Sequence, residues 1–136
     1  MREELKGPKV EGVAIAVVQE TSDPGNEEYA VYILNFREDI LEGVLITSTG
    51  YGVNANTGEK IKTSTLRHTM EVLLPNEVAK IEPIMPELFG LSNEYWVSFW
   101  INEVMYDRKY TFPAESITLQ NLKHLEHFNK KGVIIK

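Results

Sequence analysis

Residues 95–112 read YWVSFWINEVMYDRKYTF, and this stretch decides the fold that the sequence predicts. Two runs rich in aromatic and β-branched residues lie on either side of Asn102 and Glu103, which is the pattern of a β-hairpin with a two-residue turn. Side chains alternate strictly between the two faces of a strand, so the two faces of this hairpin can be assigned from the sequence.

One face of the predicted hairpin is almost continuously apolar, and we expect it to face the core. It carries Tyr95, Val97, Phe99, Ile101, Val104, Tyr106, Tyr110 and Phe112. Arg108 interrupts this face. A charged side chain in such a position indicates a location near the edge of a sheet.

The opposite face carries both tryptophans of the chain among polar residues. A two-residue turn sets Trp100 opposite Met105 and Trp96 opposite Lys109, which gives a sulfur–aromatic pair and a cation–π pair. Tryptophan and methionine on a solvent-facing sheet are typical of protein interfaces. The sequence therefore predicts an interaction surface at Trp96, Trp100, Met105 and Lys109. The alternatives are that the C-terminal segment covers this face or that it forms a groove for a small ligand.

Five further strands are predicted outside the hairpin, because β-branched and aromatic runs are separated by proline, glycine and asparagine. They span residues 10–20, 29–36, 44–49, 60–74 and 78–84. Residues 65–74 (TLRHTMEVLL) fit helical periodicity as well as strand alternation, and we predict a strand there. Near the C-terminus, Leu119, Leu122, Leu125 and Phe128 recur every third residue after Thr118, a possible cap, which predicts a short helix over 118–128.

Together these elements predict an all-β fold: a single-domain antiparallel β-sandwich of about seven strands, immunoglobulin-like by pattern only. We expect residues 1–136 to form one domain, with 1–8 as a flexible N-terminal arm and 118–136 as a helix and tail packed on the sandwich. A length of 136 residues suits a single core, and 43% hydrophobic residues suit a soluble globular chain.

Charge and cysteine content narrow the function classes. A formal net charge of −6 disfavours binding to nucleic acid or to an anionic membrane. The apolar run 13–18 is too short to span a membrane. The absence of cysteine excludes disulfides, thiolate metal sites and cysteine nucleophiles, and it is compatible with a reducing compartment. We therefore expect a cytoplasmic protein.

The glycine-rich run TSTGYGVNANTGEKIKTSTL, residues 47–66, is interpreted as containing the loop that connects the strands predicted at 44–49 and 60–74. A phosphate-binding Walker loop has four residues between its glycines and a lysine after the second, whereas Gly52 and Gly58 enclose five residues and are followed by Glu59. The Gly50-Tyr51-Gly52 run also lacks the following helix of a dinucleotide fingerprint.

Other candidate chemistry is isolated in the sequence. His124 and His127 are three residues apart and could share a metal on a helix, but no third ligand can be identified, so no metal and no cofactor are predicted. The sequence predicts a non-catalytic protein-interaction or assembly module that uses the aromatic face or a sheet edge and contacts a protein partner or a second copy as a homodimer. The alternative is a small-ligand-binding protein or hydrolase-like enzyme with a polar site at one end of the sandwich, drawing on Tyr51, Asn54 and His68.

Overall fold

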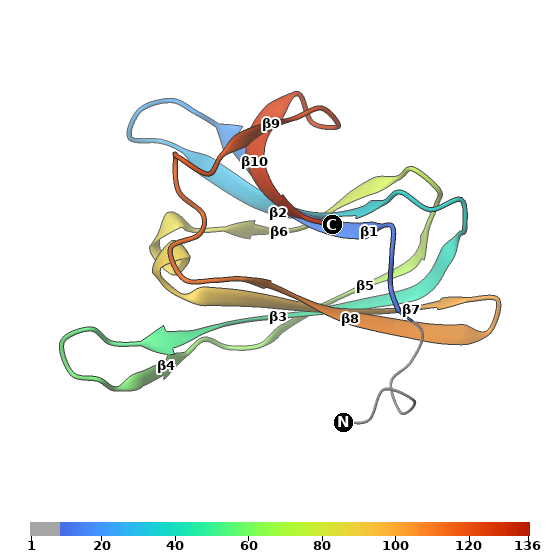
Figure 1. Ribbon diagram of the computed structural model, residues 1–136, viewed down its shortest axis with the longest axis horizontal. Coiled ribbons are helices and arrows are strands. Elements are labelled where there is room, and N and C mark those ends of the chain that lie inside the picture. Colours follow the sequence, from blue (N-terminus) through green and yellow to red (C-terminus); the bar gives the residue numbers. More distant parts are fainter. Residues whose placement is uncertain (1–8) are drawn as a thin grey trace.

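The computed structural model describes residues 9–136, which form a sandwich of two antiparallel β-sheets (Figure 1). The predicted all-β sandwich is confirmed. The described strands are β1 (Val13–Thr21), β2 (Glu28–Asn35), β3 (Leu41–Val53), β4 (Lys60–Lys62), β5 (Leu66–Leu73), β6 (Val78–Ile84), β7 (Ser92–Ile101), β8 (Val104–Phe112), β9 (Lys123–Leu125) and β10 (Lys130–Ile135), and the 3-10 helix η2 (Pro86–Gly90) joins β6 to β7. The N-terminal arm predicted at 1–8 lies outside the described residues.

Each sheet combines strands that are distant in the sequence. Sheet A has the order β6-β2-β1-β10-β9, and sheet B has the order β4-β3-β7-β8. The long strand β3 also pairs with β5, so the single strand predicted at 60–74 is two strands: β4 lies beside the end of β3 and β5 beside its first two thirds. Residues 65–74 are therefore largely strand, as predicted.

The described part of the chain contains no helix long and apolar enough to cross a membrane.

The hairpin that decides the fold has the predicted register. Ile101 pairs with Val104 across the turn, and Asn102 and Glu103 have φ angles of 46° and 67°. These two left-handed residues define a turn whose twist matches that of the strands. Six residues of the predicted core face are buried, namely Tyr95, Val97, Phe99, Ile101, Tyr110 and Phe112. Val104 differs from the prediction and is exposed; it is the first residue of the edge strand β8, next to the turn.

Replacing Glu103 by glycine should stabilise the domain. Its left-handed backbone costs a residue with a Cβ atom about 1 kcal/mol relative to glycine. We expect the Glu103→Gly variant to gain about that much in free energy of unfolding, measured by urea denaturation. Glu87→Gly, outside the turn, should give no such gain. A loss of stability in Glu103→Gly would contradict this turn geometry.

The helix predicted at 118–128 is absent, and this prediction is wrong. Residues 123–135 instead form the β9–β10 hairpin, in which β10 pairs with β1 over Ile15–Val18 and joins sheet A. The recurrence of apolar residues at every third position does not reflect a helix, since Leu119 is 77% exposed whereas Leu125 packs on the outer face of sheet A. Pairing with the open edge of β1 outweighs the weak helical preference of the segment.

The C-terminal hairpin covers the outer face of sheet A. Leu125 and Phe128 join Tyr32 and Phe36 over the small side chains of β1, and the Tyr32 and Phe128 rings lie 4.8 Å apart. Burial, together with a hydrogen bond to the Glu20 carboxylate, raises the pKa of Tyr32 to about 12. The same carboxylate binds Lys130 Nζ at 2.8 Å, which ties β10 to β1. The C-terminal segment therefore packs on the sandwich, but on the sheet opposite the tryptophans.

Candidate functional site

The predicted interaction residues lie together on the outer face of sheet B. The β7–β8 register sets Trp100 opposite Met105 and Trp96 opposite Lys109, as the hairpin predicted. Trp96, Trp100 and Met105 are 46%, 45% and 48% exposed. We call this group, with Lys109, the tryptophan face.

Polar contacts hold the Trp96 ring on the sheet. Its Nε1 donates to Asp107 Oδ2 at 3.3 Å, and Lys109 Nζ lies 5.9 Å from the ring centroid. The same lysine lies 3.8 Å from Glu94 Oε1. These contacts order the side chains before any partner arrives, which lowers the entropy lost on binding.

Trp100 lies against a glycine of the neighbouring strand. Gly43 has a φ of 55°, and a Cβ atom placed on it would lie 3.3 Å from Trp100 Cδ1. The β3–β7 register shifts at this point, between Glu42 and Leu45. The glycine therefore leaves room for the indole close to the sheet, and its role could not be read from the sequence pattern.

A hollow of about 430 Å³ extends the tryptophan face toward β4. It is lined by Thr47, Thr49, Tyr51, Lys62, Glu94 and Trp96. Tyr51, which the sequence assigned to a polar site, therefore lies on the outer face of sheet B.

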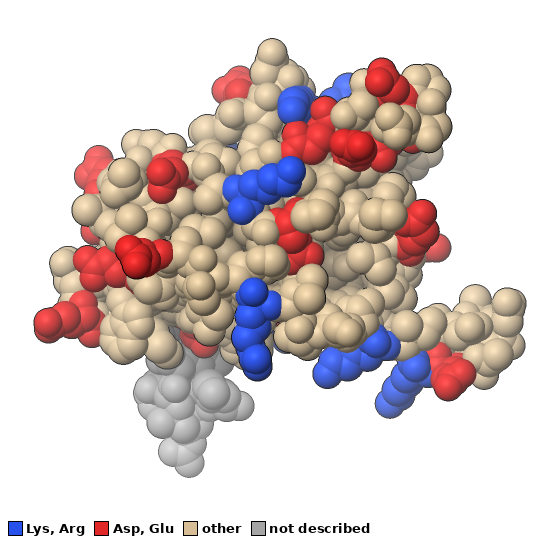
Figure 2. All heavy atoms as spheres, turned by 180° about the vertical axis from the view of Figure 1, so that it is seen from behind, with Lys and Arg blue, Asp and Glu red and all other residues tan. Residues whose placement is uncertain are grey.

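Seen from behind, the molecule presents acidic and basic side chains interspersed, with no continuous basic track on that side (Figure 2).

The other residues of the predicted polar site do not join Tyr51. Asn54 begins the β3–β4 loop, where its Oδ1 accepts the backbone N–H groups of Asn56 and Thr57. Gly58, at a φ of 71°, donates its N–H to the Asn54 carbonyl. These N–H groups are occupied within the loop, and β-strands lie on both sides. The glycine run therefore connects two strands, but by a shorter loop than predicted: β3 continues to Val53, so Gly50 and Gly52 lie within a strand.

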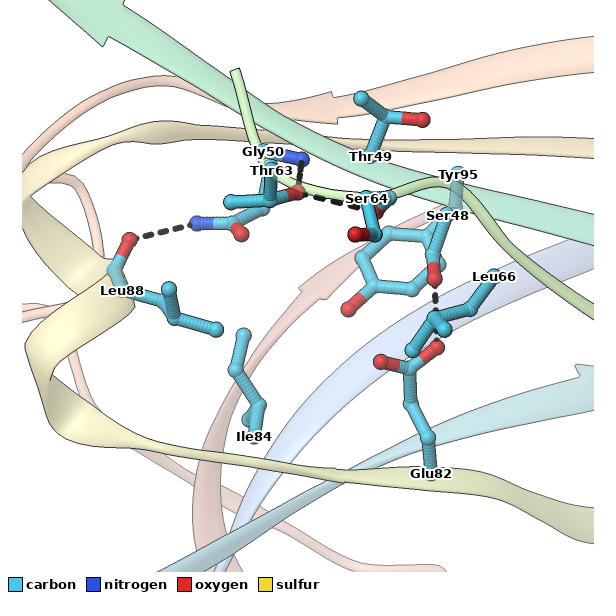
Figure 3. A pocket seen from close by; sticks show the side chains of 11 residues that line it. Ser48, Thr49, Gly50, Thr63, Ser64, Leu66, Glu82, Ile84, Leu88 and Tyr95 are labelled. Atoms are coloured by element: carbon cyan, nitrogen blue, oxygen red, sulfur yellow. Dashed lines mark hydrogen bonds between the residues drawn. The ribbon is translucent and has the colours of Figure 1, made fainter. Parts of the chain in front are cut away.

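His68 faces the interior between the sheets, where it meets a carboxylate. Its Nε2 lies 3.0 Å from Glu82 Oε1, and Ser48 Oγ donates to the same oxygen at 2.6 Å (Figure 3). In a Ser-His-acid triad the imidazole lies between the hydroxyl and the carboxylate. Here the carboxylate occupies the middle position, so the cluster lacks the geometry that activates a serine.

The two C-terminal histidines do not lie on one helix. His124 lies on β9, whereas His127 lies in the β9–β10 turn, where its ring centroid is 4.9 Å from that of Phe36. Among residues 9–136, no three histidine, aspartate or glutamate side chains are grouped as metal ligands. The sequence reasoning missed one group altogether: Glu82, Ser48 and Tyr95 line a pocket between the sheets, although they belong to three different strands.

Comparison with known proteins adds no assignment: the chain matches no protein-family model and no curated protein.

Proposed function

We propose that this protein is a non-catalytic assembly module that forms a homodimer through the tryptophan face. The observation that carries the proposal is the exposure of Trp96, Trp100 and Met105 side by side on one sheet. Large apolar side chains held in fixed positions are the residues that contribute most to binding energy at protein interfaces.

The charges around the tryptophan face favour a second copy as the partner. The outer face of sheet B carries both signs, with Lys60, Lys62, Arg67 and Lys109 among Glu42, Glu94 and Asp107. These seven charges sum to only +1, although the chain as a whole carries −6. Two copies can therefore meet at this face with little net repulsion, and each acidic side chain can find a basic one. We also place the module in the cytoplasm, since a chain without cysteine suits a reducing compartment.

Light scattering after gel filtration tests this proposal on the native chain and on Trp100→Glu. We expect a native dimer that the substitution weakens by at least about a hundredfold, because a carboxylate buried in the interface would have no partner. Leu119→Glu is the matched control, since it adds the same charge at an exposed leucine of the β8–β9 connection. This control should remain a dimer.

Three results would overturn the proposal. A native chain that is monomeric at high concentration excludes self-association. A dimer that survives Trp100→Glu excludes the tryptophan face and points instead to pairing along the edge strand β8. If Trp100→Glu unfolds, Trp96→Ser serves as the second variant, and a dimer unchanged by that substitution also contradicts the proposal.

The alternative function, small-ligand binding, is favoured by a different observation. The pocket between the sheets contains a carboxylate and a tyrosine hydroxyl in a mainly apolar setting. Such a combination is typical of small-molecule sites.

A further inference from the structure

A pocket of about 200 Å³ opens between the two sheets, beside β6 and the segment that joins β4 to β5 (Figure 3). Its apolar wall is formed by Leu66, Ile84 and Leu88, which come from β5, β6 and η2. Thr63 braces the rim, because its Oγ1 accepts the Gly50 N–H at 2.8 Å. The pocket is therefore built from both sheets, and hydrogen bonds between Gly50 and Thr63 fix part of its rim.

Glu82 supplies a negative charge to this pocket. Its side chain is only 13% exposed, and its Oε1 already accepts hydrogen bonds from Ser48 and His68. The other carboxylate oxygen faces the pocket (Figure 3). A buried carboxylate is stable when both of its oxygens accept hydrogen bonds. The second oxygen of Glu82 can therefore accept a hydrogen bond from a donor in the pocket.

Tyr95 supplies a hydroxyl that has no partner within residues 9–136. The residue is 2% exposed, and its ring points into the pocket from β7 (Figure 3). No fully enclosed polar side-chain atom of the described residues lacks a hydrogen bond, so this hydroxyl must be reached through the pocket. Burial, and also the nearby charge of Glu82, raises the pKa of Tyr95 well above its usual range, which keeps the hydroxyl protonated.

The lining residues select the charge of a ligand. Neither lysine nor arginine occurs among the residues that line the pocket, and His68 contacts only the Glu82 oxygen that is already hydrogen-bonded to Ser48, so an anion in the pocket would meet the carboxylate with no basic lining residue to pair with. A cationic donor would instead form a charge-assisted hydrogen bond to the carboxylate, which is stronger than a neutral one.

We propose that this pocket binds a small protonated amine with a short aliphatic chain. The ammonium group donates to the free oxygen of Glu82 and to the Tyr95 hydroxyl oxygen, and the aliphatic chain lies against Leu66, Ile84 and Leu88. The site lies on the inner side of sheet B, whereas the tryptophan face lies on its outer side, so the two proposals do not depend on each other.

Amide NMR spectra of the full chain can test the site with three probes of similar length and different charge: n-butylammonium, n-butanol and butyrate. We expect saturable shifts at Ser48, Gly50 and Glu82 with n-butylammonium, binding on the order of tenfold weaker with n-butanol, and no saturation with butyrate. Equal responses to the amine and the alcohol would overturn the proposed role of charge. The absence of saturable shifts at these amides would overturn the site.

Three variants test whether n-butylammonium binds in this pocket or at a carboxylate elsewhere on the surface. Glu82→Gln and Tyr95→Phe should each weaken n-butylammonium binding, by on the order of tenfold and severalfold respectively. Glu94→Gln removes a carboxylate on the outer face of sheet B and should leave the affinity unchanged. Because Glu82→Gln alters the contacts of Ser48 and His68 and could unfold the domain, Tyr95→Phe provides the second test. The proposal would be contradicted if Tyr95→Phe and Glu82→Gln both fold and keep the native affinity for n-butylammonium. It would also be contradicted if Glu94→Gln loses affinity.

Discussion

Replacing Gly132 by alanine is expected to lower the free energy of unfolding by about 3 kcal/mol. Gly132 lies between two strands of sheet A, where it pairs with Val18 of β1 on one side and with Lys123 of the edge strand β9 on the other. An added Cβ atom would lie 2.4 Å from the Val17 carbonyl oxygen and 2.7 Å from Leu125 Cδ1. The Leu125 side chain can move, but the backbone oxygen belongs to the most buried strand and cannot move without separating β10 from β1.

Gly90→Ala is the matched control for this prediction. Gly90 ends the 3-10 helix η2, and a Cβ atom placed there would meet nothing within 4 Å. Its stability should stay within about 0.5 kcal/mol of the native value. Urea denaturation followed by circular dichroism measures both variants. Equal stabilities for Gly132→Ala and Gly90→Ala would contradict the close packing of the C-terminal hairpin against β1.

Gly132 also shows why part of the fold could not be predicted. The β7–β8 hairpin was predictable to the register, because its alternation and its turn lie within 18 consecutive residues. The β9–β10 hairpin gives no such signal: β9 has three residues, and β10 contains the glycine where a side chain would mark a face. Its place in sheet A depends on contact with β1, more than a hundred residues earlier.

The two candidate sites also differ in how far they could be predicted from the sequence. The tryptophan face follows from local alternation, so Trp96 and Trp100 could be placed on one surface from the sequence. The pocket could not, because Ser48 and Tyr95 meet only through the pairing of β3 with β7, and Glu82 joins them only when the two sheets stack. One signal was present: in a strand alternation, Glu82 shares the face of Ile84, and a carboxylate on a core-facing strand indicates a polar or functional site.

Asn35→Ala is the second substitution with a large expected effect, because the buried Asn35 amide binds both the β2–β3 connection and the β5–β6 connection. Asn35 is 1% exposed, and its Nδ2 lies 2.9 Å from the Asp39 carbonyl oxygen and 3.1 Å from that of Leu74. Its Oδ1 accepts the Arg37 N–H at 2.9 Å. Alanine would leave these backbone groups without partners in a place that water cannot easily enter. We expect a loss of about 3 kcal/mol.

Two further variants separate hydrogen bonding from shape at this position. Asn35→Asp keeps the shape but directs a second oxygen at the backbone carbonyls, so it should destabilise the domain at least as much as Asn35→Ala. Asn121→Ala removes an exposed amide that donates to the Ser116 carbonyl at 2.8 Å, and it should cost about 0.5 kcal/mol. Urea denaturation gives the stabilities, and hydrogen exchange at the Arg37 amide reports the local opening. A folded Asn35→Asp with native stability would show that packing, and not the hydrogen bonds of this amide, holds the two connections together.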